Sequence, residues 1–135
     1  MSISKKIRII DRNIISDSRG YFVKLLTGKE ADLPSYTGEI YLTSAKPNEV
    51  KGGHYHPQAK EWFILLQGQC RLDLVDISTQ EKMSIDILAQ VPQTVYVPSG
   101  IAHQFVNTSS QHDFMLLAYT DKHYDPTDTV AYTNF

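Results

Sequence analysis

The chain has 135 residues, of which 41% are hydrophobic and 21% charged, and its formal net charge at neutral pH is −2. This length predicts a single domain spanning residues 1–135, and the mildly acidic balance excludes an electrostatic footprint for nucleic acid or an anionic membrane. Cys70 is the only cysteine, so an internal disulfide is excluded and a reducing compartment, the cytoplasm, is expected. The apolar run before Asp11 is too short for a signal peptide or a membrane span.

Short segments in which apolar residues alternate with period two follow one another along almost the whole chain. They are rich in Ile, Val, Leu, Phe and Tyr, and glycine and proline residues separate them. In chain order, the predicted strands span residues 6–15, 39–46, 61–67, 69–78, 83–91, 94–98, 103–107 and 113–120. The best helical candidate is the short stretch 27–34. Strands at this spacing predict an all-β sandwich or barrel.

Alternation also predicts which side chains share a face of a strand. In the strand 69–78, Cys70 and Leu72 point to one side and Arg71 to the other. The same reasoning applies to His54 and His56, which lie two residues apart on an extended segment. Both imidazoles would then point the same way, so that they could meet a single ion.

Two stretches carry the candidate chemistry. GGHYHPQAKE, residues 52–61, offers two imidazoles and a carboxylate, and PSGIAHQFVN, residues 98–107, offers a third imidazole just after a Pro-Gly turn. Three neutral imidazoles and one carboxylate suit a divalent zinc, iron, nickel, cobalt or manganese ion and leave a position open for water or substrate. The candidate metal ligands are His54, His56, Glu61 and His103. The alternatives are that the pair of histidines is an ordinary feature of a strand, or that the histidines move protons in a pocket without metal.

These two stretches resemble the two sequence motifs of the cupin superfamily, and all four of the family's metal-ligand positions are filled. The second motif departs at its start, because Pro92 and Gln93 stand where the family has a glycine. The resemblance implies a single-domain cupin, which is a jelly-roll β-barrel or double-stranded β-helix with its site in the mouth.

The flanking segments resemble a narrower group of cupins. ISDSRGYFVKL, residues 15–25, is similar to the opening of dTDP-4-dehydrorhamnose 3,5-epimerases and sugar 3,4-ketoisomerases, and AYTDKHYDPTDTVAY, residues 118–132, is similar to the tail of the epimerases. Residues 44–69 also resemble the C-terminal cupin of capsular polysaccharide reductases. The resemblance implies an isomerase or epimerase that acts on a nucleotide-linked 4-keto-6-deoxysugar in surface polysaccharide or deoxysugar biosynthesis. It further implies a homodimer and no organic cofactor.

Such a reaction removes a proton beside a carbonyl, passes through an enolate and returns the proton elsewhere. By resemblance to the epimerases, His54 or His56 would be the base and Tyr119 the acid, and Tyr41 and Tyr124 are alternative acids. An imidazole nitrogen that binds a metal cannot also be the base. Either a metal holds the enolate oxygen while a tyrosine or a free histidine moves the proton, or the histidines act directly without metal.

Four residues are candidates for binding the substrate. The resemblance implies that Arg19 and Phe22 reach the phosphate and the base of the nucleotide, often across a dimer interface. Lys51, which lies near the candidate ligands in the sequence, and Tyr41 are the other two candidates. If these residues have no part in binding, Asp17 would pair with Arg19 in a polar turn and Lys51 would be a solvated surface residue.

Two other classes of function remain open at this point. The same four ligands would suit a metal-dependent cupin oxygenase or lyase that acts on a small acid. A cupin that binds a small ligand without turnover would also carry such a pocket.

Overall fold

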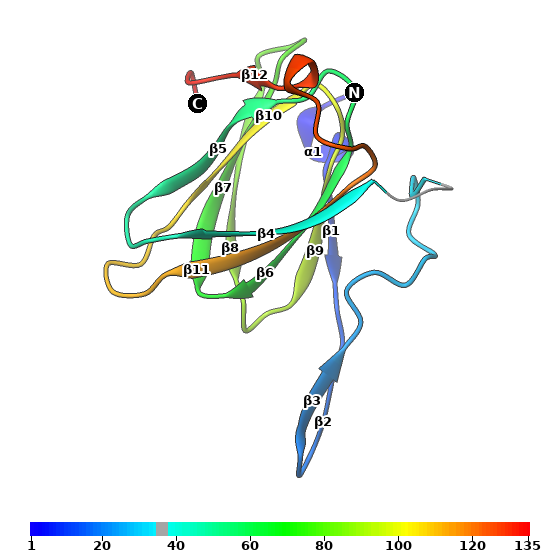
Figure 1. Ribbon diagram of the computed structural model, residues 1–135, viewed down its shortest axis with the longest axis vertical. Helices are drawn as coiled ribbons and strands as arrows, with labels where there is room; N and C mark the ends of the chain where they lie inside the picture. The colour runs from blue at the N-terminus through cyan, green and yellow to red at the C-terminus, as the bar shows by residue number, and fades with distance from the viewer. Residues whose placement is uncertain (35–37) are drawn as a thin grey trace.

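The protein is built from two five-stranded antiparallel sheets that face each other, with a two-stranded hairpin projecting from them (Figure 1). The computed structural model describes residues 1–34 and 38–135. The first sheet has the order β1 (Arg8–Asp11), β9 (Gln93–Val97), β6 (Glu61–Gln67), β11 (Phe114–Thr120) and β4 (Glu39–Ala45). The second has the order β12 (Val130–Ala131), β5 (Val50–Tyr55), β10 (Ile101–Val106), β7 (Gln69–Asp76) and β8 (Lys82–Leu88).

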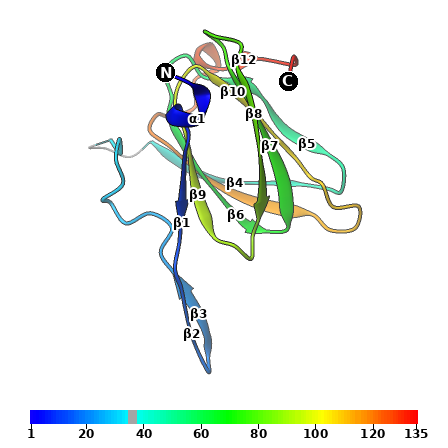
Figure 2. The same ribbon diagram turned by 180° about the vertical axis from the view of Figure 1, so that it is seen from behind.

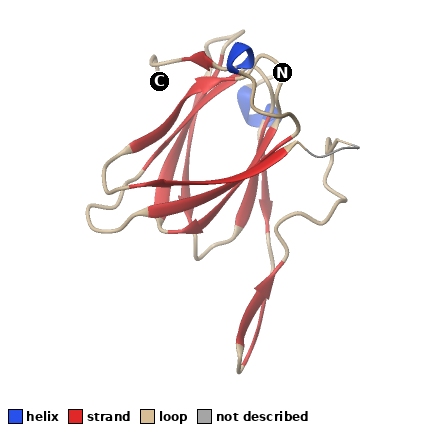
Figure 3. Cartoon of the chain, viewed as in Figure 1, coloured by secondary structure: helices blue, strands red, loops and turns tan. Residues whose placement is uncertain are grey.

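The prediction of an all-β protein is confirmed (Figure 3). The hairpin pairs β2 (Ile14–Asp17) with β3 (Gly20–Val23). In the part of the chain that the structure describes, the helical elements are the one-turn α1 (Ile3–Lys6) and the 3-10 turn η1 (Pro126–Asp128). Within residues 1–34 and 38–135, no helix is long and apolar enough to span a membrane.

The main core fills the space between the two sheets. Cys70, Leu72 and Leu74 of β7 are buried in it, as the alternation predicts, while Arg71 is exposed on the outer face. Each fully buried leucine contributes about 1.5–3 kcal/mol to folding. The core thus fixes the distance between the sheets and so the position of everything that projects from their inner faces.

Two predictions of secondary structure differ from the structure. The strand expected at 6–15 is interrupted at residues 12–13, where the chain leaves β9 and enters the hairpin. The helix expected at 27–34 is wrong, because the Glu30 carboxylate accepts hydrogen bonds from the backbone N–H groups of Thr27 and Gly28 and so holds the segment as a loop. Asp32 adds a left-handed residue, with φ of 69°, that a helix cannot contain.

This loop covers a second, aromatic cluster on the outer face of the first sheet. Trp62 packs against Tyr96 and Tyr119, with ring centroids 5.0 and 5.4 Å apart, and Leu26 and Leu33 close the cluster from outside. Trp62 is therefore fully buried within its own chain, although its side chain points away from the main core. When the molecule is seen from behind, the loop lies to the left of the two sheets and the hairpin projects below them (Figure 2).

The Arg12–Glu30 ion pair, at 2.7 Å, ties this covering loop to the residue that follows the strand β1. Burial alone would raise the pKa of Glu30, but the N–H groups of Thr27 and of Glu30 itself, together with Arg12, outweigh it and lower the pKa to about 2. Because the pKa in the folded state lies below the usual 4.5, the stabilisation is complete above that pH and is lost as the pH falls toward 2.

We therefore expect Glu30→Gln to lower the free energy of unfolding by about 1–3 kcal/mol at neutral pH, and the difference from the wild type to shrink below pH 4.5. Urea unfolding at a series of pH values measures this. The exposed Glu49→Gln variant is the control and should match the wild type throughout. An equal deficit for Glu30→Gln at every pH would contradict the account.

Candidate active site

The four candidate ligands come from both sheets and meet at one end of the space between them. His54 lies on β5 directly opposite His103 on β10, His56 follows the end of β5, and Glu61 begins β6 on the facing sheet. The ligand atoms of these four residues all lie within 4.8 Å of one another. The structure thus brings together the whole set that the sequence motifs predict.

A glycine allows the two histidine-bearing strands to approach. The pairing of β10 with β5 shifts in register between His103 and Gln104, and Gly52 lies at this shift with φ of 92°. A Cβ atom at this position would lie 2.9 Å from the carbonyl oxygen of His103, closer than real Cβ atoms come. Glycine therefore satisfies both the backbone angle and the close contact.

Backbone carbonyls accept hydrogen bonds from two of the imidazoles. The Nδ1 of His103 lies 3.0 Å from the carbonyl oxygen of Ile101, and the Nδ1 of His56 lies 2.8 Å from that of Asp128. A carbonyl oxygen only accepts, so each Nδ1 carries the hydrogen and donates it. The Nε2 atoms of both rings are then left to face the centre of the cluster.

Both Nε2 atoms face the same carboxylate oxygen. Glu61 Oε1 lies 3.0 Å from His56 Nε2 and 3.3 Å from His103 Nε2, in a side chain only 3% exposed. Its other oxygen accepts the hydroxyl of Tyr41 at 2.8 Å, whereas Oε1 has no hydrogen-bond donor within residues 1–34 and 38–135. A buried carboxylate oxygen that faces two ring nitrogens requires a cation, either protons on the imidazoles or a metal ion.

The pKa values follow from this crowding. Burial opposes ionisation of Glu61, but His103 and His56 outweigh it and hold the pKa of Glu61 far below its usual range. Burial also lowers the pKa of His56, and Glu61 reverses this to a net increase. Burial, with His103 and His56 nearby, lowers the pKa of His54 to about 4. Burial and then Glu61 raise the pKa of Tyr41, so its hydroxyl keeps its proton.

The residues present fit a divalent metal. Bonds of about 2.0–2.2 Å to nitrogen and oxygen place neighbouring ligand atoms about 3 Å apart. The separations of 3.0 and 3.3 Å around Glu61 Oε1 agree with that spacing. Three imidazoles and one carboxylate would hold such an ion and leave a position open toward solvent.

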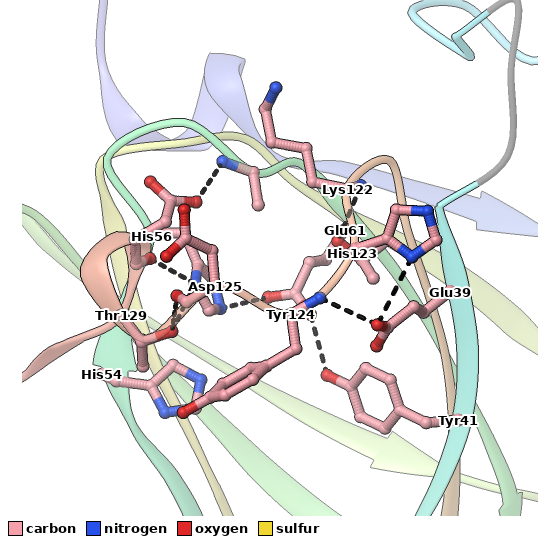
Figure 4. Close-up of a pocket in the computed structure, with 13 residues that line it drawn as sticks. Glu39, Tyr41, His54, His56, Glu61, Lys122, His123, Tyr124, Asp125 and Thr129 are labelled. Carbon is pink, nitrogen blue, oxygen red and sulfur yellow. Dashed lines mark hydrogen bonds and ion pairs between the residues drawn. The ribbon is translucent and has the colours of Figure 1, made fainter.

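A pocket of about 340 Å³ opens above this cluster (Figure 4). Its far wall is the C-terminal segment 120–129, and β4 contributes Glu39 and Tyr41. The Glu39 carboxylate accepts the backbone N–H of Tyr124 at 2.8 Å and lies 3.8 Å from His123 Nδ1. The lining residues are Glu39, Tyr41, His54, His56, Ala59, Glu61, Thr120, Lys122, His123, Tyr124, Asp125, Asp128 and Thr129.

The tyrosine expected as the acid does not line this pocket. Tyr119 belongs to the aromatic cluster with Trp62, on the opposite face of β11 from the pocket-lining Thr120. The two alternative tyrosines, Tyr41 and Tyr124, do line the pocket. The tail of the chain aligns with that of the epimerases only to within one residue. Because side chains alternate between the two faces of a strand, a shift of one residue moves a tyrosine to the other face of β11.

The residues expected to bind the substrate lie in different parts of the structure. Lys51 lines a smaller cavity of about 110 Å³ behind His54. Arg19 and Phe22 lie on the projecting hairpin, far from the pocket of the same chain (Figure 1). There Arg19 pairs with Asp17 at 2.7 Å, which is the plain alternative foreseen for this turn, and both side chains are exposed.

Several pocket residues were not singled out from the sequence, namely Glu39, Lys122, His123, Asp125, Asp128 and Thr129. Most follow β11 in a segment without alternation. The one local signal there is Asp125-Pro126, in which the aspartate side chain accepts the N–H of Thr127 and caps η1.

Comparison with known proteins places these features in a family. The family model described as the polysaccharide biosynthesis C-terminal domain matches residues 15–132. The TDP-4-oxo-6-deoxy-alpha-D-glucose-3,4-oxoisomerase of Aneurinibacillus thermoaerophilus is 30% identical over 129 residues, which cover 95% of this chain and 88% of that protein. The UDP-2-acetamido-2,6-beta-L-arabino-hexul-4-ose reductase of Pseudomonas aeruginosa is 28% identical over 110 residues, or 82% of this chain, which spans only 28% of the reductase.

A solved structure supports the fold. The dTDP-6-deoxy-D-glucose-3,5-epimerase of Legionella pneumophila Philadelphia 1, in complex with dTDP-4-keto-L-rhamnose, superposes with a TM-score of 0.82 over 93% of this chain and 72% of that one. The sequence identity is 19%, so the likeness is one of fold. It confirms the cupin fold that the sequence motifs implied.

The two neighbouring glycines allow the approach of β5 to β10 to be tested. Gly53 also has a positive φ, of 79°, but the nearest atom to a Cβ there is 3.6 Å away. We expect Gly53→Ala to lower the free energy of unfolding by about 1 kcal/mol and Gly52→Ala by about 2 kcal/mol or more, because only Gly52 adds a backbone clash to the strain. Urea unfolding measures both. Equal losses would show that the contact with His103 is unimportant.

Proposed function

The chain belongs to the polysaccharide biosynthesis C-terminal domain family, and from this premise we propose that it is an isomerase or epimerase acting on a nucleotide-linked 4-keto-6-deoxysugar. The reaction moves a proton at carbon beside the sugar carbonyl, either by 3,4-keto migration or by epimerisation at C3 and C5. The observation that carries the proposal is the cluster of three imidazoles and a buried carboxylate at the floor of a pocket with titratable walls. Surface polysaccharide or deoxysugar biosynthesis is the setting that fits.

We propose that His54, His56, Glu61 and His103 hold one divalent metal ion. The support is the buried Glu61 Oε1, which faces two imidazole nitrogens without a hydrogen-bond donor in the described part of the chain. A bound ion supplies positive charge that stabilises an enolate oxygen. Zinc, iron, nickel, cobalt and manganese all accept this set of ligands.

Proton transfer then falls to pocket residues outside the ligand set. His123 lines the pocket with its Nδ1 3.8 Å from the Glu39 carboxylate, and an imidazole at this place can take a proton from carbon. Tyr124 is the next residue, and its backbone N–H is held by the same carboxylate. We assign His123 as the base and Tyr124 as the acid, and Tyr41 as a residue that orients Glu61 through its hydroxyl.

The other readings of the pocket have less support. Neither relative described above is an oxygenase or a binding protein, and both act on nucleotide-linked keto sugars by name. Direct acid–base action by the histidines without metal would leave His54, with its lowered pKa, as the base. That arrangement would still require protons on both imidazoles that face Glu61.

The test is the exchange of solvent deuterium into TDP- or UDP-linked 4-keto-6-deoxyglucose, followed by NMR. We expect a ketoisomerase to exchange the C3 hydrogen and to place deuterium at C4 of the 3-keto product, and an epimerase to incorporate deuterium at C3 and C5. Tyr124→Phe should slow turnover about 100-fold or more, the usual contribution of a general acid. The matched Tyr119→Phe variant should exchange at the wild-type rate after correction for folded fraction. An absence of exchange into either sugar would overturn the proposed function.

We further propose that two copies form a homodimer and that the protein acts in the cytoplasm. The hairpin presents Ile15 and Phe22 with 66% and 58% of their surface exposed, and β4 presents Ile40 and Leu42 similarly. Such apolar surface is expected to be buried at an interface. A second copy would bring Arg19 of one hairpin toward the pocket of the other, where it suits a nucleotide phosphate.

This arrangement predicts that Arg19→Ala weakens the binding of TDP about tenfold or more, as measured by isothermal titration calorimetry. Lys29→Ala removes an exposed cation elsewhere and should bind TDP like the wild type. Sedimentation should give a dimer for all three proteins. A monomer that binds TDP with unchanged affinity after Arg19→Ala would contradict the proposal.

A further inference from the structure

The turn that carries His56 is held by the segment that follows β11. The backbone N–H groups of Gln58 and Ala59 donate to the Asp128 carboxylate at 2.8 and 3.0 Å, and that of Lys60 donates to the Asp121 carboxylate at 2.9 Å. Both aspartates are buried, at 8% and 7% exposed. Two carboxylates thus bind three consecutive backbone N–H groups just after the histidine.

Asp128 differs from Asp121 in a second contact. Its own backbone carbonyl accepts the Nδ1 hydrogen of His56 at 2.8 Å, and the hydroxyl of the next residue, Thr129, lies 3.5 Å from the same nitrogen. One residue therefore holds the turn through its side chain and the imidazole through its main chain. The hydrogen on Nδ1 leaves Nε2 directed at Glu61 Oε1.

The conformation of Asp128 is itself set by a rigid short turn. Asp125 caps η1 by accepting the N–H and the hydroxyl of Thr127, and Pro126 fixes its first backbone angle. The N–H of Asp128 then donates to the carbonyl of Asp125 at 2.9 Å. The direction of the Asp128 carbonyl is therefore fixed by local sequence and not only by His56.

We propose that Asp128 is a positioning residue that holds the Nδ1 hydrogen and the orientation of His56, and that its carboxylate and its carbonyl act together in this. In Asp128→Asn the new NH₂ group would face a backbone N–H, so one of the two turn contacts becomes a donor facing a donor. The turn and the carbonyl of the same residue would shift, and His56 Nε2 would lose its alignment. The kinetic consequence of this shift rests on the proposed function.

The experiment compares Asp128→Asn with Asp121→Asn, which removes the same kind of buried carboxylate from the same turn without touching His56. We expect kcat of Asp128→Asn to fall about 10- to 100-fold with KM changed less than about threefold, the usual effect of losing an outer partner of a ligand. Asp121→Asn should keep kcat within about threefold of the wild type. Equal kcat losses in the two variants would overturn the proposal.

A second readout does not depend on turnover. In metal-free protein with ¹⁵N-labelled histidines, NMR should show a slowly exchanging Nδ1–H hydrogen on His56 in the wild type and in Asp121→Asn, and rapid exchange of that hydrogen with water in Asp128→Asn. If Asp128→Asn does not fold, Pro126→Gly loosens the exposed turn η1 and should give the same rapid exchange. An unchanged exchange rate in the variant measured would overturn the proposal. If the wild-type protein exchanges no sugar proton, the proposed function is refuted, but the positioning role of Asp128 is still decided by the NMR result.

Discussion

The structure depends on one buried carboxylate. Glu61 begins β6 and reaches across the space between the sheets to two imidazoles, while the hydroxyl of Tyr41 holds its second oxygen. An isolated carboxylate with so little exposure would be costly, so the arrangement is stable only with a cation beside Oε1. The close approach of the strands, the Nδ1 hydrogen bonds and the overlying pocket together build this centre.

Strand alternation links the centre to the rest of the core. Glu61 points into the site, whereas its neighbour Trp62 points to the outer face and is buried beneath the loop tied down by Arg12 and Glu30. A slip of β6 by one residue would exchange a carboxylate for an indole at the centre. The aromatic cluster and the register of β6 with β11 and β9 therefore keep Glu61, and not Trp62, directed into the site.

Period-two patterns predicted most strands, and the spacing of two sequence motifs predicted the four residues of the centre, because both are local properties of the sequence. The loop at 27–34 could not be foreseen, since Glu30 finds its partner Arg12 only in the folded chain. Tyr119 was expected in the pocket because the motif fixes it only to within one residue, and the difference decides the face. Asp128 acts on His56 through a backbone carbonyl, which no residue type reveals.

The most direct test of the central claim is elemental analysis combined with X-ray absorption spectroscopy of the purified protein. We expect one divalent metal per chain, bound by three imidazole nitrogens and one carboxylate oxygen at about 2.0–2.2 Å, and a loss of metal in Glu61→Gln. Protein that carries no metal and turns over at full rate after exhaustive chelation would contradict it.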